Sequence, residues 1–208
     1  MTRPILDRIV IATHNAGKLR EFSELLHPFV KEIVSAGDLK LPSPEETGAT
    51  FAENAILKAK AAALASNSLA LADDSGLCIT ALGGKPGIHS ARWAEPTGAE
   101  QSRPNLKTNN FAVAMQRVEK ELADLKDRTA YFICVLALCR PDGSCETIEG
   151  RIDGTIASAQ RGANGHGYDP IFIPNGYGIT FAEMDEEEKN RISHRGLATR
   201  ALVERFFS

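Results

Sequence analysis

Two short segments near the N-terminus carry side chains suited to phosphate groups and a divalent cation. The first is the turn 13–18, between the β-branched stretch 8–13 and the amphipathic stretch 17–26. A helix that begins at such a turn offers unpaired N–H groups and a positive dipole end, which favour an anion. The turn is not a Walker A loop, because Ala12 and Leu19 stand where that loop needs Gly and Ser or Thr. The alternative interpretation is an ordinary capped turn between a strand and a helix, in which Lys18 is solvated and binds no ligand.

The second segment is Asp73-Asp74-Ser75-Gly76, which follows the apolar stretch 69–72. We expect the strand to end there in a turn closed by Gly76. Neighbouring side chains of an extended chain point to opposite sides, so one carboxylate can face a site while the other braces the turn. Mg²⁺ is usually bound by one or two protein carboxylates, and water molecules and substrate phosphates occupy its other coordination positions. Glu45 and Glu46 offer a further oxygen ligand, although a solvated loop is the simpler interpretation of that pair.

The C-terminal third adds groups that could recognise a base. The glycine turn 165–170 presents an imidazole, an aromatic ring and a carboxylate, from His166, Tyr168 and Asp169. Such groups can stack on a base and hydrogen-bond its edge. Basic residues follow the acidic run 183–188; among them are Lys189 and, in the first turn of the last predicted helix, His194 and Arg195. Cations are disfavoured in the first turn of a helix, which suggests an anionic ligand there, with a salt bridge to the acidic run as the alternative.

The composition limits the classes of partner that this protein is expected to bind. The chain has 208 residues, 43% apolar and 25% charged, which suits one globular domain over residues 1–208. A formal net charge of −3 gives no positive field for a nucleic acid. The sequence contains no apolar run of membrane-spanning length and no signal peptide, so we predict a cytoplasmic protein without a membrane partner. Together the residues indicate a Mg²⁺-dependent nucleotide enzyme or a nucleotide sensor.

The elements that must position these groups alternate between strand and helix patterns. Thr50 and Glu53 form the pattern of a capping box before an alanine-rich stretch, which predicts a helix over 51–66. Strands are predicted at 8–13, 32–35, 69–73 and 171–173, and a hairpin over 129–138 and 145–156. Further helices are predicted at 17–26, 104–125 and 193–207, and an irregular loop at 81–93. This order indicates an α/β fold with a mixed central sheet flanked by helices. The four cysteines lack metal-site spacing and are predicted to be reduced thiols.

Motifs distributed from end to end resemble those of the inosine triphosphate pyrophosphatase-like family. They are Thr13-x-Asn15-x-Gly17-Lys18, Glu46-Thr-Gly48 with Phe51-x-Glu53-Asn54-Ala55, Ala72-Asp-Asp-Ser-Gly-Leu77, Pro86-Gly-Ile88 with Ser90-Ala-Arg92, Gly167-Tyr-Asp-Pro-Ile-Phe172, Phe181-Ala-Glu-Met184, and Lys189-Asn190 with Ser193-His-Arg-Gly196. The resemblance implies an elongated, two-lobed single domain with an active-site cleft, assembled as a homodimer. It implies Mg²⁺-dependent hydrolysis of ITP, dITP and XTP to the monophosphate and pyrophosphate, which cleanses the nucleotide pool.

The resemblance also implies roles for matching residues. Asp74 would be the general base and a metal ligand, Glu46 a metal ligand, and Ser75 a substrate contact. The triphosphate would be held by Thr13, His14, Asn15, Ala16, Gly17 and Lys18. The base would be held by His166, Gly167, Tyr168, Asp169, Lys189, His194 and Arg195. Lys58, one helical turn beyond Asn54, could also reach phosphate.

One departure and two alternatives accompany this resemblance. The family commonly has Phe where this chain has His166, so we expect altered affinity and pH dependence without loss of function. A nucleotide sensor without turnover is one alternative. A septum-inhibitor-like pyrophosphatase acting on pyrimidine or modified nucleotides is the other, and the cations at 193–195 disfavour it.

Overall fold

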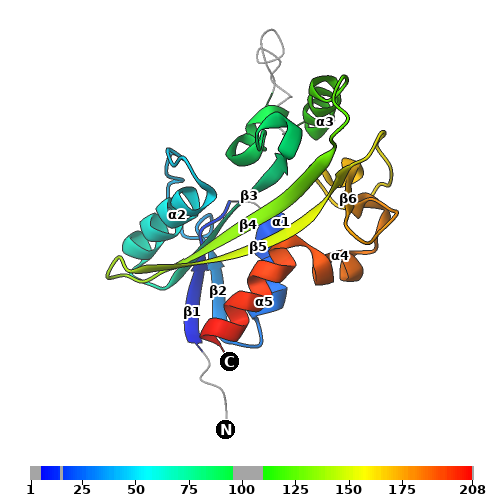
Figure 1. Cartoon of the computed structure of the whole chain (residues 1–208). Helices are drawn as coiled ribbons and strands as arrows, with labels where there is room; N and C mark the ends of the chain where they lie inside the picture. The colour runs from blue at the N-terminus through cyan, green and yellow to red at the C-terminus, as the bar shows by residue number, and fades with distance from the viewer. Residues whose placement is uncertain (1–5, 15, 96–109, 208) are drawn as a thin grey trace. The chain divides into compact units, whose positions relative to one another are not determined.

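The computed structural model of the protein describes residues 6–14, 16–95 and 110–207 (Figure 1). Its six strands are hydrogen-bonded in the order β2-β1-β3-β4-β5-β6. Their bounds are β1 Leu6–Ile11, β2 Val30–Ser35, β3 Ala70–Ile79, β4 Thr129–Cys139, β5 Cys145–Ile156 and β6 Phe172–Pro174. The α-helices are α1 Ala16–Leu26, α2 Phe51–Ser66, α3 Phe111–Glu121, α4 Glu186–Ile192 and α5 His194–Phe206.

The sheet is mixed, as predicted. Strand β1 pairs in parallel with β2 and with β3, whereas β5 pairs antiparallel with β6. The successive residues Ile9, Val10 and Ile11 are all buried, as expected for a parallel strand covered on both faces. The α/β class and the mixed sheet with helices are therefore confirmed.

The chain forms two compact units, each with its own core. The first unit comprises residues up to Asp74, then Cys134–Gly150 and Arg195 onward. The second comprises Ser75–Ile133 and Arg151–His194. Buried side chains of the first core include Phe22, Leu26, Leu71, Leu136 and Leu202. Those of the second core include Leu77, Val118, Phe132, Phe172 and Phe181. None of the helices in the described residues is long and apolar enough to cross a membrane.

Several predicted elements match the structure closely. Helix α2 has the predicted bounds, and the side chain of Thr50 accepts a hydrogen bond from the backbone N–H of Glu53. The Glu53 carboxylate accepts from the N–H of Ala49, the residue before the N-cap, so only the Thr50 half of the predicted capping box forms as expected. The hairpin β4–β5 is also confirmed, with one residue added to its first strand.

The predicted turn at Asp73–Gly76 is wrong. Strand β3 continues through these residues to Ile79, and nine of its ten residues are buried. The apolar residues that follow, Leu77, Cys78 and Ile79, favour continued extended structure in a core and outweigh the turn preference of the aspartates and Gly76. The two carboxylates therefore lie within a buried strand.

Three further segments differ from the bounds or structure expected from the sequence. The end of the acidic run, for which no element was predicted, begins helix α4, because Asp185 caps this helix and three glutamates favour its N-terminus. The expected loop 81–93 contains short 3-10 helices at Thr80–Leu82, Gly87–His89 and Arg92–Ala94. Only 110–125 of the predicted helix 104–125 lies among the described residues, and α3 occupies Phe111–Glu121.

The prediction that every cysteine is reduced is also wrong. Cys139 and Cys145 form a disulfide across the end of the β4–β5 hairpin, with their Cα atoms 4.1 Å apart. The two strands of the hairpin bring these residues opposite each other, which the sequence spacing alone did not reveal. Cys78 and Cys134 are buried free thiols, as predicted.

Candidate active site

The first unit gathers the predicted phosphate turn and the two aspartates. Helix α1 begins at Ala16, directly after the turn, and Lys18 lies in its first turn. The Lys18 ammonium donates to both carboxylate oxygens of Asp73, at 2.9 and 2.8 Å. Asn15 lies outside the described residues, as does the side chain of Ala16. A buried carboxylate thus anchors the lysine predicted to bind phosphate.

Strand β3 directs its two carboxylates toward different neighbours. Asp73 contacts Lys18 and, at 3.7 Å, the guanidinium of Arg195. Asp74 faces helix α2, where the Asn54 amide lies 3.3 Å away and the Lys58 ammonium 3.6 Å away. The alternation of side chains along a strand explains this separation, which the sequence predicted.

These surroundings give the two carboxyl groups opposite acidities. Burial raises the pKa of Asp73, but the charges of Lys18, Arg195 and then Lys58 outweigh it and hold this pKa well below its usual range. Burial also raises the pKa of Asp74, and the negative charges of Glu46 and Asp73 add to it, so its pKa stays above the ordinary value despite Lys58. Asp73 therefore stays ionised at a lower pH than an ordinary aspartate, whereas Asp74 is the better proton acceptor.

Helix α2 joins Asp74 to the loop that carries Glu46. The Lys58 ammonium lies 2.6 Å from the Glu46 carboxylate, so one cation contacts Glu46 and Asp74 together. Glu45 is exposed, so Glu46 is the member of the pair that approaches the site. The side-chain amide oxygen of Asn54 accepts from the backbone N–H of Gly48, which ties the same loop to the helix. A Cβ at Gly48 would lie 2.6 Å from that oxygen, so the close approach requires glycine.

The carboxylates of Glu46 and Asp74 suit a hard divalent cation. Mg²⁺ is commonly held by one or two carboxylates, with its remaining positions filled by water and phosphate oxygens. Among the described residues, no group of three or more His, Cys, Asp and Glu side chains is arranged to hold a metal by itself. The contacts of Lys58 show that these two carboxylates can approach a single positive charge. The donor set therefore fits a cation shared with substrate phosphates.

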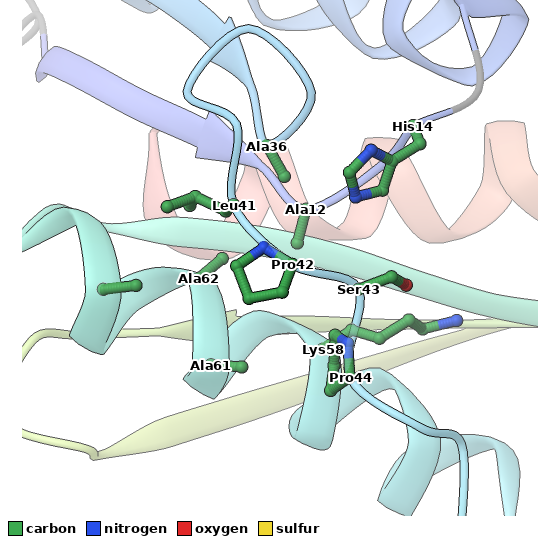
Figure 2. A pocket seen from close by; sticks show the side chains of 11 residues that line it. Ala12, His14, Ala36, Leu41, Pro42, Ser43, Pro44, Lys58, Ala61 and Ala62 are labelled. Atoms are coloured by element: carbon green, nitrogen blue, oxygen red, sulfur yellow. The ribbon is translucent and has the colours of Figure 1, made fainter.

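A small pocket of about 50 Å³ lies beside this group (Figure 2). Its walls are mainly apolar and come from the loop 41–44 and from alanines of α2. His14 and Lys58 line it as well, together with the hydroxyl of Ser43. The pocket thus has an apolar interior and cationic or titratable groups from the predicted phosphate turn and from α2.

In the second unit, Asp169 organises the glycine turn. Its carboxylate accepts from the backbone N–H of His166 at 2.8 Å and from the Lys189 ammonium at 2.5 Å. Gly165 has a positive φ of 73°, and a Cβ there would overlap the Asp169 carboxylate. Three of the predicted base-binding residues, His166, Asp169 and Lys189, are therefore brought together.

Tyr168 differs from its expected role. Its ring is 2% exposed and packs edge-on against Phe111, with the ring centres 5.4 Å apart. Its hydroxyl donates to the backbone carbonyl of Ser90. The ring is therefore part of the core, whereas the neighbouring side chain of His166 is exposed and can meet a base.

His194 and Arg195, which follow α4, belong to different units. His194 belongs to the second unit, is buried, and stacks on Phe132 with ring centres 4.7 Å apart. Arg195 belongs to the first unit, where it pairs with Glu21 at 2.8 Å and with Asp73. Ser75, also in the second unit, follows Asp74 on β3 and is half-buried.

Two residues of the site were not predicted to have these contacts. Glu21 lies on α1 one turn beyond Lys18, a spacing that could have placed it on the same helix face. Its pairing with Arg195 spans 174 residues and leaves no local signal in the sequence. Lys58, which the sequence places within possible reach of phosphate, contacts the carboxylates of Glu46 and Asp74.

Comparison with known proteins gives a consistent result. Residues 9–205 match the model of the Ham1 family. A dITP/XTP pyrophosphatase of Rhodospirillum centenum is 51% identical over 205 residues, covering 97% of this chain and 96% of that protein. A dITP/XTP pyrophosphatase of Gluconobacter oxydans is 50% identical over 196 residues, covering 94% and 89%. A solved structure of a HAM1 protein from Coxiella burnetii is 42% identical, with a TM-score of 0.85 and coverage of 96% and 98%.

Proposed function

This chain belongs to the Ham1 family, and we propose that it hydrolyses deaminated purine nucleoside triphosphates, dITP, XTP and ITP, to the monophosphate and pyrophosphate. The observation that carries the proposal is the pair Asp73 and Asp74 on β3. One carboxylate anchors the lysine of a phosphate turn, and the other is a buried proton acceptor next to Glu46. A nucleotide sensor has no use for such an acceptor.

The triphosphate is bound by residues 13–18. The start of α1 at Ala16 places the positive end of the helix dipole beside this turn, and Lys18 supplies a positive charge. Because Asp73 holds the ammonium of Lys18 with two hydrogen bonds, the lysine is preorganised for phosphate. Thr13 and His14 lie in the same turn. The phosphate chain is thereby held in line for attack at the α-phosphorus.

Asp74 accepts the proton of the attacking water. The water oxygen bonds to the α-phosphorus, the bond from that phosphorus to the bridging oxygen breaks, and pyrophosphate leaves. The raised pKa of Asp74 makes its carboxylate a stronger base than an exposed aspartate. No covalent intermediate is required.

Glu46 and Asp74 would hold Mg²⁺, since both carboxylates can approach one cation. When bound, the ion would offset the negative charge of the phosphate oxygens. Lys58 would supply a further positive charge beside the same carboxylates.

The purine is recognised by the second unit. Lys189, fixed by Asp169, can donate to the O6 atom of a 6-oxo purine, and the exposed imidazole of His166 can stack on the ring. Ser75 and His194 of this unit also contact the substrate, and so does Arg195 of the first unit, which is paired with Glu21 and Asp73. We also propose a homodimer that works in the cytoplasm.

A panel of nucleotides tests this function. The purified chain is incubated with Mg²⁺ and dITP, XTP, ATP, TTP or dCTP, and pyrophosphate and monophosphate are quantified. We expect both products from dITP and XTP. Binding without product would indicate a sensor, and preferential turnover of TTP or dCTP would indicate a pyrimidine-directed pyrophosphatase. Hydrolysis in ¹⁸O-labelled water locates the attack, because the label enters the monophosphate only if water attacks the α-phosphorus.

A further inference from the structure

The hairpin β4–β5 carries a disulfide whose two cysteines differ in burial. Cys139 ends β4 and is fully buried, whereas Cys145 begins β5 and is half-buried. The turn 140–144 between them is mostly exposed. A small molecule that approaches the hairpin from solvent therefore meets Cys145 first.

The neighbours of the two sulfur atoms differ as well. The Sγ atom of Cys139 lies 3.9 Å from the backbone carbonyl oxygen of Ile56 on α2. The Sγ atom of Cys145 lies 3.7 Å from the carbonyl oxygen of Gly143, within the hairpin turn itself. Cys139 thus faces a helix of the protein interior, and Cys145 faces the turn.

Two guanidinium groups stand next to Cys145. The carboxylate of the adjacent residue Glu146 pairs with Arg140 at 3.3 Å and with Arg205 at 2.8 Å. These three side chains carry one net positive charge. The Asp142 carboxylate in the turn and the Lys60 ammonium beside Gly143 add one charge of each sign, so one net positive charge remains at the hairpin end. This charge favours the approach of an anion, such as the thiolate of a small acidic thiol.

We propose that the Cys139–Cys145 disulfide is a thiol-exchange site, at which a small acidic monothiol such as glutathione attacks Cys145. The thiolate forms a bond to the Sγ atom of Cys145, the protein disulfide breaks, and its electron pair passes to Cys139, which takes up a proton. The resulting Cys139 thiol has a hydrogen-bond acceptor ready in the Ile56 carbonyl.

A second small thiol completes the exchange. Its thiolate bonds to the sulfur of the captured molecule, and Cys145 leaves and is protonated. Two small thiols are oxidised to one small disulfide, and the protein disulfide is reduced to two thiols. In a cytoplasm rich in small thiols these steps would reduce the bond, and the reverse steps with the small disulfide as oxidant would re-form it, unlike a permanent structural disulfide.

The two other thiols do not compete for the reagent. Cys78 and Cys134 are buried, and burial raises the pKa of both, that of Cys134 to about 12. Both stay protonated near neutral pH, and a protonated thiol is a poor nucleophile. Modification should therefore be confined to the hairpin.

A matched pair of variants tests whether Cys145 is more reactive than Cys139. Cys139→Ser leaves Cys145 as a free, half-exposed thiol, and Cys145→Ser leaves Cys139 as a buried one. Each full-length variant is treated with oxidised glutathione, and the rate of glutathionylation is followed by intact mass spectrometry. We expect Cys139→Ser to react at Cys145 at least roughly tenfold faster than Cys145→Ser reacts at Cys139. The double variant measures the background from Cys78 and Cys134, and circular dichroism verifies folding.

The unmodified protein gives an independent measurement. After treatment with oxidised glutathione, peptide mapping without reduction should find the Cys139–Cys145 link, and added reduced glutathione should yield a mixed disulfide at Cys145. Equal rates in the two variants, label on Cys78 or Cys134, or a wild-type protein in which Cys139 and Cys145 stay unlinked would overturn the proposal. These readouts do not depend on nucleotide hydrolysis.

Discussion

Asp73 and Asp74 are adjacent in sequence, yet their environments assign them different tasks. Asp73 has three positive charges around it and stays ionised, while Asp74 is buried near other negative charges and binds a proton more readily. The sequence predicted that the two carboxylates face opposite ways, because alternation is a property of any extended chain. It could not predict which one meets Lys18, since that contact joins residues 55 positions apart.

The first prediction concerns Asp74. Asp74→Asn keeps the shape of the side chain but removes its basicity and charge, so kcat for dITP should fall by about 10²–10⁴-fold. Lys18→Ala should mainly raise KM, because it removes phosphate binding and leaves the base in place. Steady-state kinetics distinguishes the two signatures. Asp153→Asn, which alters an exposed carboxylate, is the matched control. An Asp74→Asn enzyme within about threefold of the parent would mean that Asp74 is not the base.

The second prediction concerns the stability contributed by Asp73. Its pKa is lower in the folded than in the unfolded chain, where it is about 3.9. Its stabilising contribution is therefore fully present above that unfolded value and is lost as the pH falls toward the folded one. Asp73→Asn leaves Lys18 and Arg195 without this counter-ion and should lower the free energy of unfolding at neutral pH by about 3–5 kcal/mol.

Urea denaturation measures this effect. The difference between Asp73→Asn and the parent should be smaller near about pH 3 than at neutral pH, because the unfolded parent then binds a proton at this position. Asp7→Asn removes an exposed ion pair to Lys31 and should change the stability little. A pH-independent difference would show that the loss comes from packing and not from the charge of Asp73.

At the scale of elements, the sequence predicted those helices and strands whose ends are marked by capping or turn residues. The capping residues and alanine content of α2 fixed both of its ends, and the turn Pro141-Asp-Gly143 located the hairpin. The length of β3 was missed because the burial of residues 73–76 depends on distant neighbours, which outweigh a local turn signal. The Cys139–Cys145 disulfide was missed because it depends on how two strands are paired.

The third prediction tests the cap of α2, which places Asn54 and Lys58. Thr50→Ala removes the oxygen that accepts from the Glu53 N–H and should destabilise the protein by about 0.5–2 kcal/mol. Thr50→Ser keeps the acceptor and is the matched control. Thermal or urea denaturation of both variants measures the difference. Equal stability of the Ala and Ser variants would show that the helix does not depend on this hydrogen bond.

At the scale of the whole molecule, the fourth prediction concerns metal and pH. Activity should require Mg²⁺, because Glu46 and Asp74 suit a shared cation. It should also fall as the pH drops through the raised pKa of Asp74, since the protonated carboxyl cannot accept a proton from water, and it should increase toward alkaline pH. Pyrophosphate release across a pH series, with and without chelator, measures both effects. Full activity in excess chelator would contradict the metal assignment.

The central claim is that the molecule selects a 6-oxo purine triphosphate and cleaves it to pyrophosphate. Adenine places an amino donor where O6 would accept from Lys189, and a polar group left unpaired in a buried site costs roughly 1–3 kcal/mol. The most direct measurement is therefore kcat/KM for dITP and dATP in the same assay, with pyrophosphate as the quantified product. The account predicts a preference for dITP of about tenfold or more. Comparable values for the two nucleotides, or orthophosphate as the product, would contradict it.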